Sequence, residues 1–479
     1  MVFNSLTFLV FLGLTLLVYY KLRFRTQNVF LLLASYVFYG WWDWRFLSLL
    51  IFTSLFDYFC GLRIEQQQNR SRRRLWLAFS IILNMGVLCA FKYFNFFAES
   101  FAALLDLLGM KMTLPVLHVI LPLGISFYTF LSMSYTIDVY RGEMKATRDP
   151  VAFMLFVAFF PHLVAGPIVR ASFLLPQCQT PRTIKYEQVT TGIWLILLGY
   201  LKKVVIADRM ASIVDLGFSP HGGAAFSDAN SWLILYAFAF QIYGDFSGYS
   251  DIARGLSKIM GFELPINFRA PYLVSNPAEF WHHWHITLST WLRDYLYIPL
   301  GGNRKGHGRT YVNLMTTMVL GGLWHGAGVA FLLWGAYHGL LLAVHRAWSN
   351  WRKRSSLPLP AVWPRRLGRI ILVILFFHVT CVGWLLFRAG ALPAGEQFPA
   401  IQRYLDAMLN LHLHSGVSPL LRPVLLLGAL GLILQWKCEA MDQFNTWRLA
   451  WKVTAVVATL AAIAAFGVFK GAQFIYFQF

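Results

Sequence analysis

The stretch that decides the fold is Thr310–His345, which reads TYVNLMTTMVLGGLWHGAGVAFLLWGAYHGLLLAVH. It contains no Asp, Glu, Lys or Arg, and a helix needs about 20 mostly apolar residues to cross a hydrocarbon core about 30 Å thick. A helix that begins near the basic Arg309 rises about 24 Å before it reaches His325, because each residue adds about 1.5 Å. The sequence therefore predicts a histidine within the membrane, nearer its outer side.

The rest of the chain has the same apolar character. Hydrophobic residues make up 58% and charged residues only 13% of the 479 residues, whereas about 25% of an ordinary soluble domain is charged. Apolar runs long enough for a bilayer recur from Ser5–Tyr20 to the C-terminus. We therefore predict an all-α polytopic membrane protein with about 11–12 transmembrane helices.

The formal net charge of +20 comes from basic residues in short loops between the apolar runs. Such loops include Lys21–Arg25, Arg70–Arg74 and Arg352–Arg354. Cytoplasmic loops of membrane proteins carry this excess of Lys and Arg, so these loops are expected on the cytoplasmic side. No basic face interleaved with exposed aromatic residues is evident, and nucleic acid is not predicted as a partner. Five scattered cysteines without CxxC spacing predict neither a disulfide nor a zinc site.

The pattern divides the chain into three segments. Residues 1–110 carry N-terminal transmembrane helices, 111–390 form a core, and 391–479 hold an amphipathic segment and the last transmembrane helices. Within the third segment, Ala391–Ser418 has apolar residues at helical spacing, which predicts an interfacial helix on the outer side. No repeat, low-complexity tract or linker divides the chain further.

One part of the core does not read as a simple helix. Val151–Arg170 contains Pro161, Gly166 and Pro167, and proline at membrane depth is tolerated where protein or a water-filled cavity shelters the freed backbone groups. We interpret the segment either as a broken, re-entrant stretch that lines an interior or as a plain kinked span.

A second unusual stretch is Glu279–Gly302, which reads EFWHHWHITLSTWLRDYLYIPLGG and is too polar for an ordinary span. If it is helical, His282, His285 and Ser289 share one face at spacings of three and four residues, and that face would line a polar cavity. The alternative is an interfacial helix whose tryptophans lie among the headgroups. HExxH is absent and no third ligand is evident, so no metal site is predicted.

Ionisable groups inside hydrocarbon are costly, which makes His325 a candidate functional residue. Its neighbours Gly321, Gly322, Gly326 and Gly328 allow close approach by another segment or a ligand. The alternative is a packing histidine with satisfied hydrogen bonds. An imidazole suits acyl transfer, because its ordinary pKa is about 6.5 and its neutral form can take a proton from a hydroxyl and return it to a leaving thiolate.

Other catalytic patterns are poorly supported. GxSxG, a Walker loop and a dinucleotide fingerprint are absent. The carboxylates Asp245 and Asp251 lie in GDFSGYSD near the end of an apolar run. They are interpreted as a cation or substrate site or, as we favour, as a hydrogen-bond cluster at a helix end.

The two polar stretches resemble the membrane-bound O-acyltransferase family, in its alginate O-acetylation branch. The block WHHWHITLSTWLRDYLYIPLGGNR is followed, about forty residues after its first tryptophan, by GGLWHGA, and QIYGDFSGYSDIARG and SYVFYGWW are also similar to that branch. The resemblance implies a helical fold with re-entrant segments around a central tunnel. It matches His325 to the essential histidine and His285 to the assisting position. We expect the tunnel wall to include Trp281, His282, Trp284, Ser289, Trp324 and Asp245.

The resemblance also implies a bacterial inner-membrane protein that takes acetyl from cytosolic acetyl-CoA and holds no permanent cofactor. A separate periplasmic SGNH-type O-acetyltransferase would complete the transfer to an exopolysaccharide such as alginate, because no hydrolase-like domain is attached. Arg304, Lys305 and Arg309 suit a phosphate-bearing donor at the inner mouth, or are ordinary loop residues. A D-alanylating relative uses a carrier protein as donor instead, which stays open.

Two other functions remain as hypotheses. The broken helices and intramembrane carboxylates are compatible with a transporter that carries out no acyl chemistry. A scaffold that only recruits the polysaccharide machinery would depend on partner assembly and not on His325. Membrane lipid is expected as a partner of the protein itself.

Overall fold

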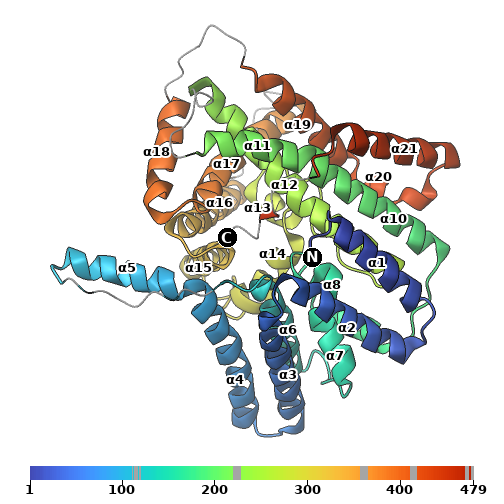
Figure 1. Cartoon of the computed structure of the whole chain (residues 1–479). Coiled ribbons are helices and arrows are strands. Elements are labelled where there is room, and N and C mark those ends of the chain that lie inside the picture. The colour runs from blue at the N-terminus through green and yellow to red at the C-terminus, as the bar shows by residue number, and fades with distance from the viewer. Residues whose placement is uncertain are drawn as a thin grey trace. The chain divides into compact units, whose positions relative to one another are not determined.

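The computed structural model describes residues 1–110, 112, 117, 120–219, 228–355, 365–409, 418–469 and 474–475. Every regular element within these ranges is a helix (Figure 1). The α-helices are α1 Leu6–Tyr19, α2 Phe24–Asp43, α3 Arg45–Gln66, α4 Arg70–Leu88, α5 Phe94–Leu107, α6 Ile125–Arg141, α7 Pro150–Ala158, α8 Phe160–Leu163, α9 Ala171–Gln179, α10 Tyr186–Tyr200, α11 Asp208–Gly217, α12 Asp228–Ile259, α13 Pro277–His283, α14 Ile286–Leu292, α15 His307–His325, α16 Val329–Arg354, α17 Arg365–Ala389, α18 Ala394–Leu409, α19 Leu421–Trp436, α20 Cys438–Asp442 and α21 Leu449–Phe466. The π-helical turns are η1 Cys89–Tyr93, η2 Leu201–Ala207 and η3 Arg293–Tyr297, and η4 Phe444–Thr446 is a 3-10 turn.

The helices have the length and composition of a multi-pass membrane protein, as predicted. Within the described ranges, six are long and apolar enough to cross a bilayer: Arg45–Gln66, Arg70–Leu107, Tyr186–Gly217, Val329–Arg354, Arg366–Ala389 and Leu449–Phe466. This is fewer than the 11–12 spans that the apolar runs predicted. One reason is that long helices such as α12, with 32 residues, carry several ionisable side chains. Another is that α1 and α19, although apolar, are shorter.

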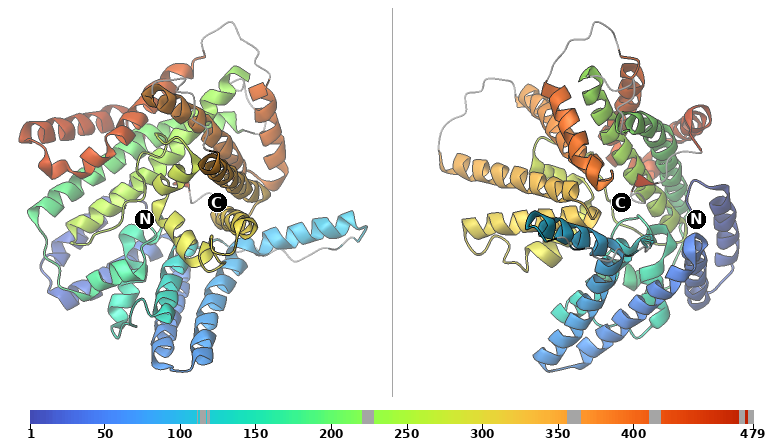
Figure 2. Two further views of the ribbon diagram at one scale, coloured as in Figure 1. Left: turned by 180° about the vertical axis from the view of Figure 1, so that it is seen from behind. Right: turned by 60° about the vertical axis from the view of Figure 1, so that its left-hand side comes forward.

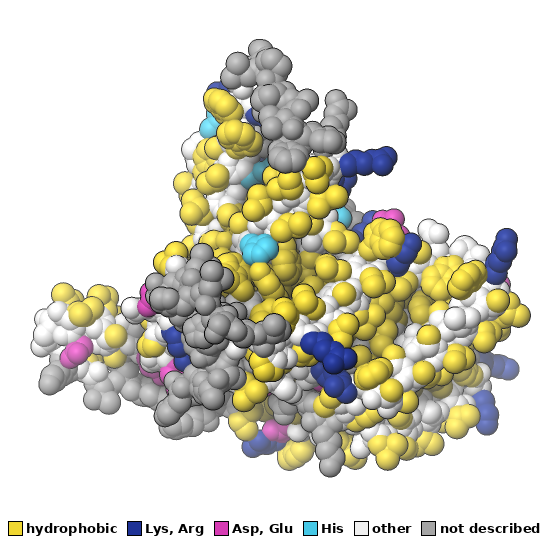
Figure 3. Space-filling view, turned by 90° about the horizontal axis from the view of Figure 1, so that it is seen from above, with side chains coloured by type: hydrophobic (Ala, Val, Ile, Leu, Met, Phe, Trp, Pro, Cys, Tyr) yellow, Lys and Arg dark blue, Asp and Glu magenta, His cyan; other side chains and the backbone are white. Residues whose placement is uncertain are grey.

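Large apolar side chains are also exposed on the surface. Leu14, Leu17, Leu107, Leu409 and Trp436 are each more than 60% exposed. In Figure 3 hydrophobic side chains cover much of the face that is shown, and Lys and Arg lie in separate groups. Soluble monomers rarely expose such continuous apolar surface, so this surface fits a hydrocarbon environment.

The chain forms two compact units whose boundaries differ from the three segments that hydropathy predicted. Unit 1 comprises Met1–Ile196 and Ile252–Pro265, and unit 2 comprises Leu197–Asp251 and Ile266–Phe479. Two of the boundaries fall inside α10 and α12. Hydropathy follows the chain locally, whereas the units follow packing between distant segments.

In unit 1, α3, α4 and α6 pack side by side (Figures 1 and 2). A fully buried carboxylate, Asp57, lies between them and accepts hydrogen bonds from Ser80 Oγ at 2.6 Å, from Asn84 Nδ2 at 2.8 Å and from Ser132 Oγ. These bonds offset the cost of burying the polar group inside the helix bundle.

The predicted break in Val151–Arg170 is present in unit 1. Helix α7 ends at Ala158, Phe159 takes a non-helical ψ of 109°, and α8 begins at Phe160. Pro161 occupies the first turn of the short α8, where its missing N–H costs nothing. The segment is therefore broken and not merely kinked.

In unit 2, α15 and α16 form a tightly packed antiparallel hairpin with a turn at Gly326–Gly328. A Cβ on Gly322 would lie 2.2 Å from the carbonyl oxygen of Phe331, and a Cβ on Gly335 would lie 2.4 Å from that of Met318. Real Cβ atoms do not come so close, so glycine is required for this helix crossing. The crossing places the end of α15 beside the start of α16.

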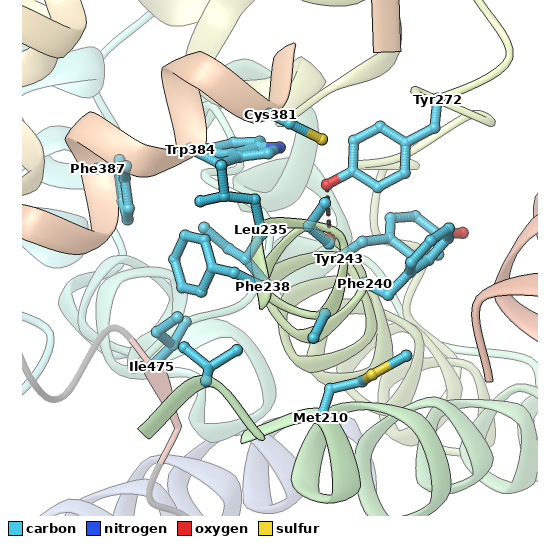
Figure 4. Close-up of a cluster of buried hydrophobic side chains, with 14 of the residues drawn as sticks. Met210, Leu235, Phe238, Phe240, Tyr243, Tyr272, Cys381, Trp384, Phe387 and Ile475 are labelled. Atoms are coloured by element: carbon cyan, nitrogen blue, oxygen red, sulfur yellow. Dashed lines mark hydrogen bonds between the residues drawn. The ribbon is translucent and has the colours of Figure 1, made fainter. Parts of the chain in front are cut away.

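A large hydrophobic core packs against the α15–α16 hairpin in unit 2 and includes Phe331 and Trp334 of α16. Figure 4 shows Leu235, Phe238 and Tyr243 of α12 together with Trp384 of α17. The one polar group of Tyr272 in this core is satisfied, because its hydroxyl donates to the carbonyl of Ala239 at 2.7 Å. Large interlocked rings make this core a rigid support for the site described below.

Helix α18 carries the predicted amphipathic pattern. Ile401 packs against Ala330, and Tyr404 stacks on Phe218 with ring centroids 4.6 Å apart, so one side of the helix is buried in unit 2. Phe398 is 55% exposed on the other side. The end of the predicted segment, residues 410–417, lies outside the described residues.

Candidate active site

His325 is the last residue of α15, and its side chain is buried with only 3% of its surface exposed. Aromatic rings surround the imidazole. Their centroids lie 4.9 Å away for Trp324, 5.1 Å for Trp334, 5.2 Å for Phe387 and 6.4 Å for His285. The structure thus brings together the two histidines that were predicted to share a site.

The predicted helix through the three histidines is interrupted. Helix α13 ends at His283, α14 begins at Ile286, and His285 between them has left-handed backbone angles of φ 42° and ψ 53°. His282 and His285 therefore do not share one helix face, contrary to the prediction. A non-glycine residue in this conformation carries strain of about 1–3 kcal/mol, which occurs most often at functional sites.

Asn267 holds His285 in this conformation. The backbone N–H of Ile286 donates to the Asn267 carbonyl at 3.0 Å. The side-chain oxygen of Asn267 accepts from the backbone N–H of Thr287 at 3.2 Å and from its hydroxyl at 2.9 Å, and it lies 3.2 Å from Nδ1 of His285. The Asn267 amide nitrogen donates to Ser250 Oγ at 3.3 Å.

These bonds fix the proton position on His285. The backbone N–H of Thr287 can only donate, so the Asn267 atom that it contacts is the amide oxygen. An oxygen acceptor at Nδ1 requires Nδ1 of His285 to carry a proton. In the neutral ring Nε2 is then a lone-pair acceptor, and it is buried without a hydrogen-bond partner among the described residues.

A third histidine, His338, joins the site and was not predicted. It is 1% exposed, and its ring centroid lies 4.9 Å from Trp334 and 5.2 Å from Trp281. Neither ring nitrogen has a hydrogen-bond partner among the residues that the structure describes. Its position four residues after Trp334, in a stretch without Asp, Glu, Lys or Arg, was the available sequence signal.

A half-open pocket of about 240 Å³ lies next to this cluster. Trp281, His282 and Ser289, three of the predicted tunnel residues, line it together with Arg293 and Thr317. Because the ring of Trp281 also contacts Trp334 at 5.8 Å, one side chain connects the pocket to the rings around the buried histidines.

The other predicted tunnel residues lie in different surroundings. Trp324 packs directly on His325, and Trp284 packs in the core 4.7 Å from the Trp384 ring. Asp245 forms an ion pair with Lys203 at 2.7 Å and accepts from the backbone N–H of Ile475 at 2.7 Å.

Asp245 and Asp251, the two carboxylates of the GDFSGYSD motif, lie within α12. They do not lie at a helix end, which was the interpretation that we favoured from the sequence. Lys203 bridges Asp245 and Asp208 at 2.7 and 2.9 Å, and Lys202 pairs with Asp251 at 2.6 Å. All of these groups are buried, and they form a layer of ion pairs between α12, η2 and the first residue of α11.

The glycines around His325 serve helix packing. Cβ atoms on Gly322 and Gly326 would collide with Phe331, and one on Gly328 would lie 3.3 Å from the Gln397 amide. The close approach predicted at these glycines is therefore made by neighbouring segments of the protein.

The three basic residues proposed for the donor mouth lie at the other end of α15. Arg304 and Lys305 precede the helix, Arg309 lies in its first turn, and all three are exposed. None of them lines the pocket beside the histidines.

The fold and the site together define a multi-pass membrane protein with a buried, preorganised pair of histidines. The chain belongs to the membrane-bound O-acyltransferase family, whose profile matches residues 31–387. It is therefore an O-acyltransferase of the membrane-bound class, and the site contains both histidines that the resemblance singled out.

Curated relatives from three kinds of bacteria match large parts of the chain. A probable alginate O-acetylase of Pseudomonas aeruginosa is 45% identical over 86% of this chain and 75% of its own length. A peptidoglycan O-acetyltransferase of Helicobacter pylori is 32% identical over 100% of this chain and 98% of its own length. A teichoic acid D-alanyltransferase of Bacillus subtilis is 28% identical over 55% of this chain and 68% of its own length.

Proposed function

We propose that this protein takes acetyl from acetyl-CoA on the cytoplasmic side of the bacterial inner membrane and passes it across for O-acetylation of an exopolysaccharide such as alginate. Support comes from the 45% identity to a probable alginate O-acetylase. The observation that carries the chemistry is the pair His325 and His285, buried with ring centroids 6.4 Å apart and with Nε2 of His285 set as an acceptor.

In this proposal His325 is the proton-transfer catalyst. Its neutral ring takes the proton of the acceptor hydroxyl while the hydroxyl oxygen forms a bond to the carbonyl carbon of the thioester. The carbon–sulfur bond breaks, and the same proton passes from His325 to the leaving thiolate. The products are the acetyl ester and the free thiol of coenzyme A, so atoms and charge balance.

His285 acts on the same step through its fixed lone pair. An acceptor atom near His325 stabilises the positive charge that His325 carries between taking and returning the proton. Asn267 holds that lone pair in place before the reaction begins, so little reorganisation is needed.

The final transfer to sugar is assigned to a separate partner. We propose a periplasmic SGNH-type O-acetyltransferase that receives the acetyl group from this protein. One relative is named a teichoic acid D-alanyltransferase. The family resemblance leaves a carrier protein as the alternative acyl donor.

The decisive experiment measures thiol release from labelled acetyl-CoA by the purified protein and polysaccharide acetylation in cells. His325→Gln is expected to lower both about 10²–10⁴-fold, the usual contribution of a general acid–base group. His307→Gln, an exposed histidine at the start of the same helix, is the matched control and keeps normal activity. Normal acetylation by a well-expressed His325→Gln protein would contradict the proposal.

The same assay tests the transporter hypothesis. Asp245 and Asp251, which motivated it, are both paired with lysines. Release of free thiol that depends on His325 is incompatible with transport alone, whereas uptake of substrate without any thioester turnover would favour the transporter.

A further inference from the structure

Two residues from the last part of the sequence, Phe474 and Ile475, lie inside unit 2. Both side chains are buried. Ile475 belongs to the same hydrophobic cluster as Met210 and Phe238 (Figure 4). A buried backbone segment needs hydrogen-bond partners for its polar groups, so the partners of this segment show what it is attached to.

The backbone of Ile475 is attached to a charged side chain of α12. Its N–H donates to Oδ2 of Asp245 at 2.7 Å, while Oδ1 of the same carboxylate pairs with Lys203 at 2.7 Å. Hydrogen bonds to an ionised acceptor are stronger than neutral ones. A few residues earlier, the N–H of Val468 donates to the carbonyl of Val204 in η2 at 3.0 Å. The segment is therefore tied both to α12 and to η2.

The ring of Phe474 packs on two rings of α12. Its centroid lies 4.8 Å from that of Tyr249 and 6.0 Å from that of Phe246. Phe246 directly follows Asp245, and its ring lies 4.6 Å from the imidazole of His285 at an interplanar angle of 87°. Aromatic pairs at these distances attract one another. The Phe246 ring thus contacts both Phe474 and His285.

These rings complete the support of the His285 side chain. The contact with Asn267 restrains the imidazole at Nδ1 alone, and one hydrogen bond does not define the plane of a ring. Packing against Phe246 and against Phe268, whose centroid lies 6.5 Å away, supplies the remaining restraint. Protein interiors are close-packed and transmit displacements, so the loss of the Phe474 ring would let Phe246 and then the imidazole shift.

We propose that Phe474 and Ile475 are positioning residues for His285. Ile475 anchors the segment on the Asp245 carboxylate, and Phe474 holds the Phe246 ring against which the imidazole rests. Both act through α12 and not on the substrate. This inference rests on the proposed role of His285 in acyl transfer, and it adds a distant part of the sequence to the candidate active site.

The test measures kcat and KM for acetyl-CoA by thiol release with the purified full-length protein, at equal amounts of folded protein. Phe474→Ala removes the ring. It is expected to lower kcat about ten- to a hundredfold, because a misplacement of about 1 Å in an active site can cost about a hundredfold. KM for acetyl-CoA stays at the wild-type value. Phe474→Leu restores most of the side-chain volume and is expected to recover part of the lost kcat.

The same substitution in a His285→Gln protein separates positioning from general stabilisation. If Phe474 acts through His285, Phe474→Ala lowers kcat no further in this background, so the two effects are not additive. Equal fractional losses of kcat in both backgrounds would overturn the inference, since Phe474 would then support only the fold. If Phe474→Ala does not yield folded protein, Phe474→Leu enters the same comparison.

A second pair of variants tests the anchor. Ile475→Pro removes the N–H that Asp245 accepts, because proline has no backbone N–H. Ile475→Val keeps the N–H and most of the side chain. We expect Ile475→Pro to lower kcat, again with no further loss in the His285→Gln background, and Ile475→Val to keep it. Equal kcat values for the two variants would remove Ile475 from the proposal.

Phe444→Ala is the control for the loss of a buried ring elsewhere in unit 2. Phe444 is buried and packs on Trp447 with ring centroids 5.6 Å apart. This variant is expected to lower the melting temperature and to keep kcat per folded molecule. If Phe474→Ala loses no more kcat than Phe444→Ala, the inference is wrong.

Chemical modification distinguishes failure of this inference from failure of the proposed function. Diethyl pyrocarbonate modifies neutral imidazoles, and mass spectrometry of the purified protein measures how fast His285 reacts. Faster modification in Phe474→Ala than in Phe444→Ala supports positioning even if His285→Gln keeps full activity, an outcome that would refute only the catalytic role of His285. Unchanged modification together with unchanged kcat in Phe474→Ala overturns the inference and leaves the role of His285 intact.

Discussion

Replacing Asn267 by leucine tests whether the hydrogen bonds of one side chain prepare His285 for catalysis. Asn267→Leu keeps the approximate size of the side chain and removes its amide. Two buried donors, the Thr287 backbone N–H and the Nδ1–H of His285, then lose their acceptor. The Thr287 hydroxyl can rotate to another acceptor, so the cost is assigned to the two N–H groups alone.

The expected magnitude follows from those two groups. A buried donor left without a partner costs about 1–3 kcal/mol, so Asn267→Leu should lower the free energy of unfolding by about 2–6 kcal/mol. Without the oxygen at Nδ1, the His285 ring is also free to place its proton on Nε2, which removes the acceptor that faces the site. We expect turnover of acetyl-CoA to fall at least tenfold at equal amounts of folded protein.

Thermal unfolding followed by tryptophan fluorescence and thiol release are measured on the same purified samples. Ser250→Ala is the matched control, because it removes the acceptor of the Asn267 amide nitrogen and leaves the contact with His285 in place. It should cost about 1 kcal/mol and change turnover less than about threefold. If Asn267→Leu loses stability but keeps wild-type turnover per folded molecule, the assigned role of Asn267 is refuted.

Two further predictions concern packing and buried charge in the same unit. Gly322→Ala places a Cβ 2.2 Å from the Phe331 carbonyl oxygen, so it should push α15 and α16 apart and lower the melting temperature sharply. Gly86→Ala is the control, because a Cβ at Gly86 has nothing within 4 Å, and it should leave the melting temperature unchanged or slightly higher. Equal melting temperatures for the two variants would show that the helix crossing tolerates a methyl group. Lys203→Met removes the cation that pairs with the buried carboxylates Asp245 and Asp208, and it should lower the free energy of unfolding by about 3–5 kcal/mol. Adding Asp245→Asn to that variant should restore part of the loss. Thermal unfolding measures both effects, and a Lys203→Met protein as stable as wild type would show that the ion pairs are not needed.

Local features of the chain determined the class of the protein and the place of its central histidine. The apolar runs predicted a helical membrane protein, and the break in Val151–Arg170 follows from proline chemistry at that position. His325 was identifiable because a single imidazole in a long uncharged stretch is unusual whatever surrounds it. These conclusions depend on properties that each segment has by itself.

Tertiary structure decided the geometry of the site. The prediction of a continuous helix through Glu279–Gly302 was wrong at His285. Hydrogen bonds donated to Asn267, 18 residues earlier in the chain, stabilise a left-handed backbone conformation at His285 that local propensity does not favour. From the sequence Asp245 was interpreted as a helix-end or substrate carboxylate. Its ion-pair partner Lys203 could not be identified from the sequence, because the two residues are far apart along the chain. A spacing of three or four residues indicates which side chains share a helix face.

The spacing of residues along one helix does not indicate which other helix its face contacts. The contact of His338 with Trp281 arises where α13 packs on α16. The sequence by itself therefore determined that this chain lies in a membrane and carries a buried imidazole. Only the folded chain decided which atoms surround that imidazole, because hydrogen bonds and pockets form between residues that folding brings together from distant parts of the sequence.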